Sequence, residues 1–182
     1  MYTLKGQGVG KEENPLDAAT GQTDMAVPTV FLGGTCGGDL WRLPFLDRFK
    51  ALGVDAYDPQ VQDWQPWRTA LENRCLQESP LVLFPVLTST LGLGSLGEVG
   101  FTVLYVLRDI MAGTPRNLVL LIEPTCTTQA DPSLLRESVR MRALVRSKAE
   151  AEARKTGIHL VDTLDEMMAV AERLLTHKTL SP

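Results

Sequence analysis

Short apolar segments alternate along this chain with segments of helical periodicity, and this alternation constrains the fold more than any other feature. Five segments have the apolar character of strands: 29–32, 54–57, 81–87, 118–122 and 159–161. In 45–52 and 67–75, apolar residues recur every three or four positions, which is the spacing of a helix with one buried face. Strands joined by helical crossovers form a parallel sheet. The sequence therefore predicts an α/β domain with a doubly wound, five-stranded parallel sheet and helices on both faces.

Three further segments complete the expected helices. Residues 95–112 are apolar almost all round, which indicates a central helix covered by other elements or by a second subunit. Residues 133–156 are expected to form a long charged helix, and the last helix begins with a capping-box pattern at 163–166. Residues 1–26 lack periodicity, so we expect a flexible N-terminal tail before a single domain at 27–178.

Composition disfavours several classes of protein. A net charge of −4 argues against a nucleic-acid polymer as partner, and glutamates interrupt the basic residues between 136 and 155, which predicts a solvated helix face. Three widely spaced cysteines and two distant histidines form no disulfide framework, zinc site or histidine triad. No apolar run is long enough for a membrane span or a secretory leader. We expect a cytoplasmic protein that uses no metal or other cofactor.

The predicted sheet also locates a ligand site. In open parallel sheets, ligands bind beyond the carboxyl ends of the strands, where the strand order reverses. With the flavodoxin-like order 2-1-3-4-5, this point lies between the first and third strands. The loops that leave these strands, 33–39 and 88–98, are the most glycine-rich parts of the folded region. Topology and composition therefore indicate the same site.

Glu98 is the strongest candidate for a catalytic residue. It is the carboxylate of the segment 92–100, which otherwise contains glycine and small or apolar residues. We expect Glu98 in the first turn of a helix, where free N–H groups and the helix dipole keep a carboxylate ionised. Such a carboxylate beside a cleft is a candidate nucleophile. Gly94 lets a ligand approach the backbone, and Ser95 is either the N-cap or a ligand contact.

The loop after the first strand has the composition of a backbone cradle for an oxygen-rich ligand, although a tight turn would use similar glycines. It offers N–H groups, a hydroxyl and a nearby guanidinium. It matches neither the phosphate-binding lysine motif nor the dinucleotide fingerprint. The candidate contacts are Gly33, Gly34, Thr35, Gly37, Gly38, Trp41 and Arg42.

The loop after the second strand carries Asp58, Asp63 and Trp64, groups that suit the face and edge of a base or sugar. Asp63 is equally suited to cap the helix that Pro66 starts. On that helix, Glu72 is either solvated or part of the site.

Together these motifs resemble the nucleoside 2-deoxyribosyltransferase-like family, over about half of the chain. The resemblance rests on the order and spacing of 31–35 with Trp41 and Arg42, of 58–64, and of 94–100. It implies a flavodoxin-like sheet and attack by a glutamate on the anomeric carbon of a sugar. Glu98 matches that nucleophile, and Glu72 falls where the transferases carry an aspartate near the sugar and base.

The chain departs from the family at Gly92, where the transferases have a base-contacting aspartate and the related monophosphate N-hydrolases a phosphate-contacting serine. The resemblance implies N-glycosidic cleavage or transfer on a nucleoside or nucleotide, with Asp63 or Glu72 assisting departure of the base. A nucleotide-sensing module without turnover and an NAD glycohydrolase are the alternatives. The apolar segment 95–112 is consistent with a homodimer or a larger assembly.

Overall fold

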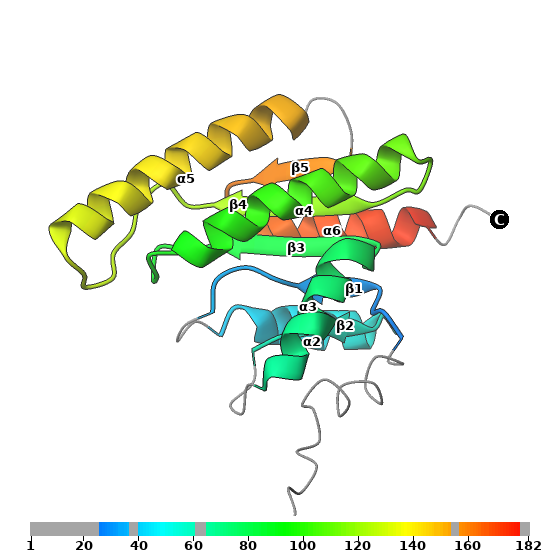
Figure 1. The fold of residues 1–182 in the computed structure, drawn as a ribbon. Helices are drawn as coiled ribbons and strands as arrows, with labels where there is room; N and C mark the ends of the chain where they lie inside the picture. Colours follow the sequence, from blue (N-terminus) through cyan, green and yellow to red (C-terminus); the bar gives the residue numbers. More distant parts are fainter. Residues whose placement is uncertain (1–25, 37–39, 61–64, 154–156, 179–182) are drawn as a thin grey trace, which may run out of the picture.

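The sheet has the predicted topology. A computed structural model describes residues 26–36, 40–60, 65–153 and 157–178. Its strands within these ranges are β1 (Val30–Leu32), β2 (Ala56–Tyr57), β3 (Leu81–Val86), β4 (Asn117–Ile122) and β5 (Ile158–Val161). All neighbouring strands are parallel, and their order is β2-β1-β3-β4-β5 (Figure 1). The flavodoxin-like prediction is therefore confirmed.

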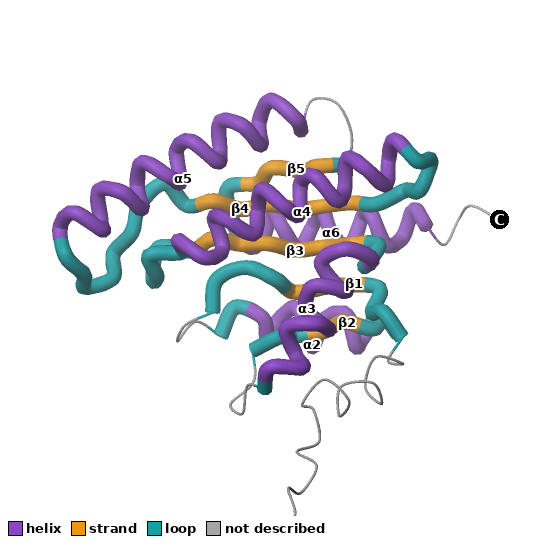
Figure 2. The backbone as a smooth tube through the Cα atoms, in the orientation of Figure 1, coloured by secondary structure: helices purple, strands orange, loops and turns teal. Residues whose placement is uncertain are grey.

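Helices cover both faces of this sheet (Figure 2). The helices α2 (Arg42–Ala51) and α6 (Leu164–Lys178) pack on one face. The other face carries α3 (Pro66–Glu78), α4 (Leu93–Met111) and α5 (Pro132–Ala153). Alternate strand residues point to opposite faces, so Val82 and Phe84 of β3 join one core while Leu81 and Leu83 join the other. The central strands are buried on both faces, which explains their continuous apolar sequences.

The α4 helix packs on the sheet with one side, and among the residues that the structure describes nothing covers the large apolar side chains on its other side. Leu96, Val99 and Val106 are buried against β3 and β4, whereas Phe101 and Leu104 are each 62% exposed and Met111 is 88% exposed. The described elements of this chain therefore cover one side of α4, and the apolar side chains on its other side are exposed. No helix among the described residues has the length and apolar character needed to cross a bilayer.

The start of α6 follows its predicted cap with one change. The N–H of Glu166 donates to Oγ1 of Thr163 at 3.1 Å, as a capping box requires. The Glu166 carboxylate instead accepts a hydrogen bond from the N–H of Asp162 at 2.8 Å, one residue before the cap. The backbone N–H groups of Asp162 and Glu166, near the start of the helix, thus both have a hydrogen-bond acceptor.

Candidate active site

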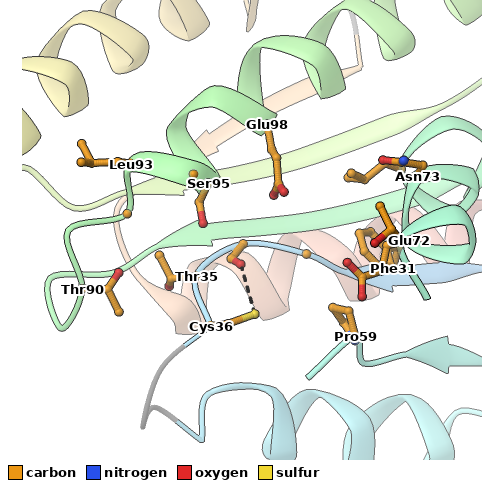
Figure 3. A pocket seen from close by; sticks show the side chains of 16 residues that line it. Phe31, Thr35, Cys36, Pro59, Glu72, Asn73, Thr90, Leu93, Ser95 and Glu98 are labelled. Atoms are coloured by element: carbon orange, nitrogen blue, oxygen red, sulfur yellow. Dashed lines mark hydrogen bonds between the residues drawn. The ribbon is translucent and has the colours of Figure 1, made fainter. Parts of the chain in front are cut away.

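A cleft of about 440 Å³ opens at the carboxyl ends of β1 and β3. Leu32, the last residue of β1, pairs with Leu83 in the parallel register, and the loop after β1 continues alongside the end of β3, where the N–H of Thr35 donates to the oxygen of Pro85 at 2.9 Å. Residues from both loops, from α3 and from α4 line the cleft (Figure 3). Its volume is in the range of small-ligand pockets. The expected meeting of the two glycine-rich loops is therefore confirmed for their described residues.

Glu98 points from α4 into the middle of this cleft (Figure 3). The prediction that it lies in the first turn is wrong, because α4 begins at Leu93 after the N-cap Gly92 and contains no acidic residue in its first turn. Glu98 lies in the second turn, beyond the free N–H groups of the helix start. The cleft walls displace water from around the carboxyl, and this desolvation raises the pKa of Glu98, although solvent still reaches the side chain.

The raised pKa of Glu98 predicts a particular pH dependence of stability. The folded state holds this proton more tightly than the unfolded state, so Glu98 favours folding at low pH and loses that contribution as the pH rises through its folded pKa. We expect the Glu98→Gln variant to gain stability relative to the wild type as the pH rises through this window. Urea denaturation at a series of pH values measures the difference, and parallel stability curves for the two proteins would contradict it.

Arg42 anchors the loop after β1 from behind. Its side chain is 2% exposed, and its guanidinium donates to the backbone oxygens of four consecutive residues: Leu32 (2.9 Å), Gly33 (2.9 Å), Gly34 (3.5 Å) and Thr35 (3.2 Å). In a trans peptide, the N–H of the next residue points the opposite way from the carbonyl. The N–H groups of Gly34 and Cys36, both of which line the cleft, therefore point away from Arg42.

Three predicted substrate contacts lie in this support and do not line the cleft. Besides its bonds to the loop, the Arg42 guanidinium donates a hydrogen bond to the side-chain oxygen of Gln60, and its Nε lies 3.3 Å from the Asp58 carboxylate. Asp58 also accepts a hydrogen bond from the N–H of Gln60 at 2.8 Å. Trp41 is buried against α2, with its ring edge-to-face to Phe45. The structure thus places Trp41, Arg42 and Asp58 behind the loop, where they shape it.

Glycine is required at two positions of the cleft wall. Gly34 has a φ of 87°, and a Cβ on it would stand 2.3 Å from the backbone oxygen of Pro85. Gly92 has a φ of 63°, and a Cβ there would stand 2.8 Å from Cγ1 of Val86 and 3.1 Å from Nη2 of Arg142. These conformations and contacts exclude a side chain. At Gly92 the backbone conformation and the close contacts therefore leave room only for glycine.

Arg142 is a part of the site framework that the sequence analysis missed. It was expected on a solvated face of the charged helix, but its side chain is fully buried. Its guanidinium donates to backbone oxygens at the end of β3, in the following loop and after β4. Charge alternation along α5 predicts solvation on average, and it cannot show which arginine turns inward to a distant loop.

One face of α3 forms the opposite wall of the cleft. The residues that line it are Thr69, Glu72, Asn73 and Leu76. They are spaced three and four positions apart and therefore share a face of the helix. Of these four residues, only Glu72 was predicted. The others could have been found from the sequence, because residues three or four positions from a site residue on a helix share its face. Glu72 and Asn73 face Glu98 across the cleft, with Phe31 beside them (Figure 3).

The remaining predicted residues are distributed as follows. Gly33, Gly34, Thr35, Gly94 and Ser95 line the cleft. Gly92 occupies the N-cap position, so Ser95 is not the cap and instead faces the cleft from the first turn of α4. The hydroxyl of Thr35 donates to the backbone oxygen of Pro85 and accepts from the N–H of Leu87, each at the long distance of 3.4 Å. Gly37, Gly38, Asp63 and Trp64 lie outside the described residues.

A scan of the chain against protein-family models found no matching family, and a search among curated proteins found no matching relative.

Proposed function

We propose that this protein cleaves or transfers the N-glycosidic bond of a nucleoside or nucleotide, with Glu98 as the nucleophile. The observation that carries the proposal is the position of Glu98, which points into a cleft with two chemically different ends (Figure 3). The α3 end offers an aromatic ring, a carboxylate and an amide, which suit a base. The loop end offers backbone N–H groups and hydroxyls, which suit the oxygens of a sugar or a phosphate.

The chemistry follows a retaining double displacement. The Glu98 carboxylate attacks the anomeric carbon and forms an ester bond while the carbon–nitrogen bond breaks, and the bonding electron pair leaves with the base. The base takes up a proton, for which Glu72 on the opposite wall is the candidate donor among the described residues, with Asp63 as the other predicted candidate. Water or a second base then attacks the same carbon, which breaks the ester and restores the Glu98 carboxylate, and the proton released by the attacking water or base returns to the group that protonated the leaving base.

Release of free base is the direct test. Purified protein is incubated with nucleosides, deoxynucleosides, their 5′-monophosphates and NAD, each with and without an acceptor base, and the products are separated by chromatography. Release that depends on Glu98 supports the proposal, and dependence on the acceptor distinguishes a transferase from a hydrolase. An acid-quenched sample should also show the 20.0 kDa chain with the mass of one sugar added. A complete lack of release from the panel contradicts the proposal.

Two alternatives use the same cleft. A nucleotide-sensing module would bind ligand without releasing base, and its affinity would persist when Glu98 becomes glutamine. Gly92 favours this alternative, because it has no side chain where the transferases carry a base-contacting aspartate and the N-hydrolases a phosphate-contacting serine. An NAD glycohydrolase would release nicotinamide from NAD in the same panel.

We also propose that the protein forms a homodimer through the open side of α4. The exposed residues of this side recur at alternating spacings of three and four: Gly94, Gly97, Phe101, Leu104, Arg108 and Met111. Apart from the backbone of the same helix, no atom of the described residues lies within 4 Å of a Cβ built on Gly94 or Gly97, so both positions face open space. In an antiparallel pair of α4 helices, the bulky half of each helix meets the glycine half of the other. The stripe is therefore complementary to itself.

The dimer proposal predicts that Leu104→Glu yields a monomer, because a charge in the centre of an apolar interface is costly to desolvate. Sedimentation velocity should show the mass falling from two chains to one. Leu144→Glu is the matched control, since Leu144 is 50% exposed on α5. A wild-type protein that sediments as a monomer at all concentrations would rule out this interface.

A further inference from the structure

Arg142 is a fully buried cation whose hydrogen bonds join segments that are far apart in the sequence. Nη1 donates to the backbone oxygens of Val86 and Glu123, each at 3.0 Å, and Nη2 to those of Leu87 and Thr90, each at 2.8 Å. All of these acceptors are neutral. A buried guanidinium is tolerated only when its donors are satisfied, so this geometry ties α5 firmly to the connection between β3 and α4.

Ser138 extends the same anchor by one helical turn. Its hydroxyl donates to the backbone oxygen of Leu91 at 2.7 Å and accepts a hydrogen bond from Nε of Arg142 at 3.2 Å. Ser138 and Arg142 are four residues apart, and both are fully buried on the inner face of α5. Together they hold backbone oxygens on both sides of the turn that leads from β3 into α4.

This anchor also contacts Gly92, the N-cap residue of α4. Nη2 of Arg142 stands 3.1 Å from the point that a Cβ on Gly92 would occupy, so the guanidinium packs beneath the N-cap. The helix then starts with a bond of 2.8 Å from the N–H of Leu96 to the oxygen of Gly92. Because a helix is a rigid rod, the orientation of its first turn decides where Ser95 and Glu98 lie in the cleft.

We propose that Arg142 and Ser138 are positioning residues of the active site: by holding the β3–α4 connection from α5, they set the direction in which α4 leaves the sheet and thereby the place of Glu98. The kinetic consequence of this role rests on the function proposed above. The structural consequence, that residues 86–98 are held in place by α5, is independent of that function.

The test compares Arg142→Lys and Ser138→Ala with a control on the same helix. Each variant removes some of the donors but keeps a side chain that can be buried, so both are expected to fold. Arg146→Lys is the matched control: Arg146 also lies on α5 and donates to the oxygen of Ile122 at 3.2 Å and to Asp162 at 2.6 Å, away from the β3–α4 connection.

Hydrogen–deuterium exchange of the full chain measures, without any substrate, how strongly α5 holds residues 86–98. In Arg142→Lys and Ser138→Ala, exchange of residues 86–98 should become about tenfold faster, because one or two hydrogen bonds to the connection are lost. Exchange in β5 and α6 should stay as in the wild type, and the control should leave 86–98 unchanged. Unchanged exchange in 86–98, or an equal increase over the whole chain, would overturn the proposal.

Steady-state kinetics on the substrate found in the base-release panel measures how the positioning by Arg142 and Ser138 affects catalysis. For Arg142→Lys, kcat should fall about 100-fold while KM changes only a few-fold, since small misplacement of a reacting group costs about this much. A loss confined to KM, or equal losses in Arg146→Lys, would overturn the positioning role. If the wild type releases no base, the proposed reaction fails, and the exchange result alone decides whether α5 orders the catalytic helix.

Discussion

The Glu98→Gln variant is expected to release free base about a thousandfold more slowly than the wild type, with substrate affinity within a few-fold. Glutamine has nearly the shape of glutamate, so the wall of the cleft is preserved. Its amide has no negative charge to stabilise an oxocarbenium-like transition state and does not form the sugar ester. Single-turnover chromatography measures the rate, and calorimetric titration of the inactive variant measures the affinity.

A carboxylate outside the cleft provides the control for this result. Glu78 lies at the end of α3 and is exposed, paired with Arg74 at 3.3 Å, so Glu78→Gln should keep the wild-type rate. Full activity in Glu98→Gln would remove Glu98 from the mechanism. Loss of ligand binding together with activity would show that Glu98 holds the ligand and would leave the nucleophile unidentified.

Replacing Arg42 by methionine is expected to cost about 3 kcal/mol of unfolding free energy, the largest effect on stability that we predict. The four backbone oxygens that the guanidinium serves would lose their donor within the protein, and the Asp58 carboxylate would lose its cation. Methionine fills part of the space but donates no hydrogen bond. The free energy of unfolding from urea titrations gives the size of the effect.

The same substitution at Arg48 isolates the contribution of burial. Arg48 lies on the same helix, but its side chain is 50% exposed and its partner is Glu172 on the protein surface. Exposed ion pairs contribute about 1 kcal/mol or less, so Arg48→Met should be nearly neutral. Equal losses at the two positions would mean that the bonds from Arg42 to the first loop add nothing to stability.

Much of the fold could be predicted because local patterns carry the information. The strands β3 and β4 coincide with continuous apolar runs, since strands buried on both faces have no polar side to alternate. The segment 54–57 became a strand of two residues, Ala56–Tyr57, because only these pair with β1 at the edge of the sheet. The crossover rules predicted a parallel sheet, and the flavodoxin-like strand order, taken as a hypothesis, placed the two glycine-rich loops together; the structure has this order.

The details of the site could be predicted less well. The helix α4 was predicted to start at residue 95, but it begins at Leu93. Neither Leu93 nor Gly94 is a residue type that marks a helix start, and only the structure shows that Gly92, in the αL conformation, is the N-cap. That difference places Glu98 beyond the free N–H groups of the first turn, and desolvation raises its pKa. Asn73 and Thr69 join Glu72 in the cleft because one face of α3 happens to be turned towards it.

The sequence by itself determined the parallel sheet, the two glycine-rich loops and Glu98 as the carboxylate of the second loop's segment, because periodicity and glycine content are properties of neighbouring residues. Only the tertiary structure decided which charged side chains lie inside. Arg42 binds a loop within ten residues of itself, but Arg142 reaches acceptors up to 56 residues away. The burial of such a cation depends on whether distant backbone oxygens converge on it, and this convergence exists only after the chain has folded.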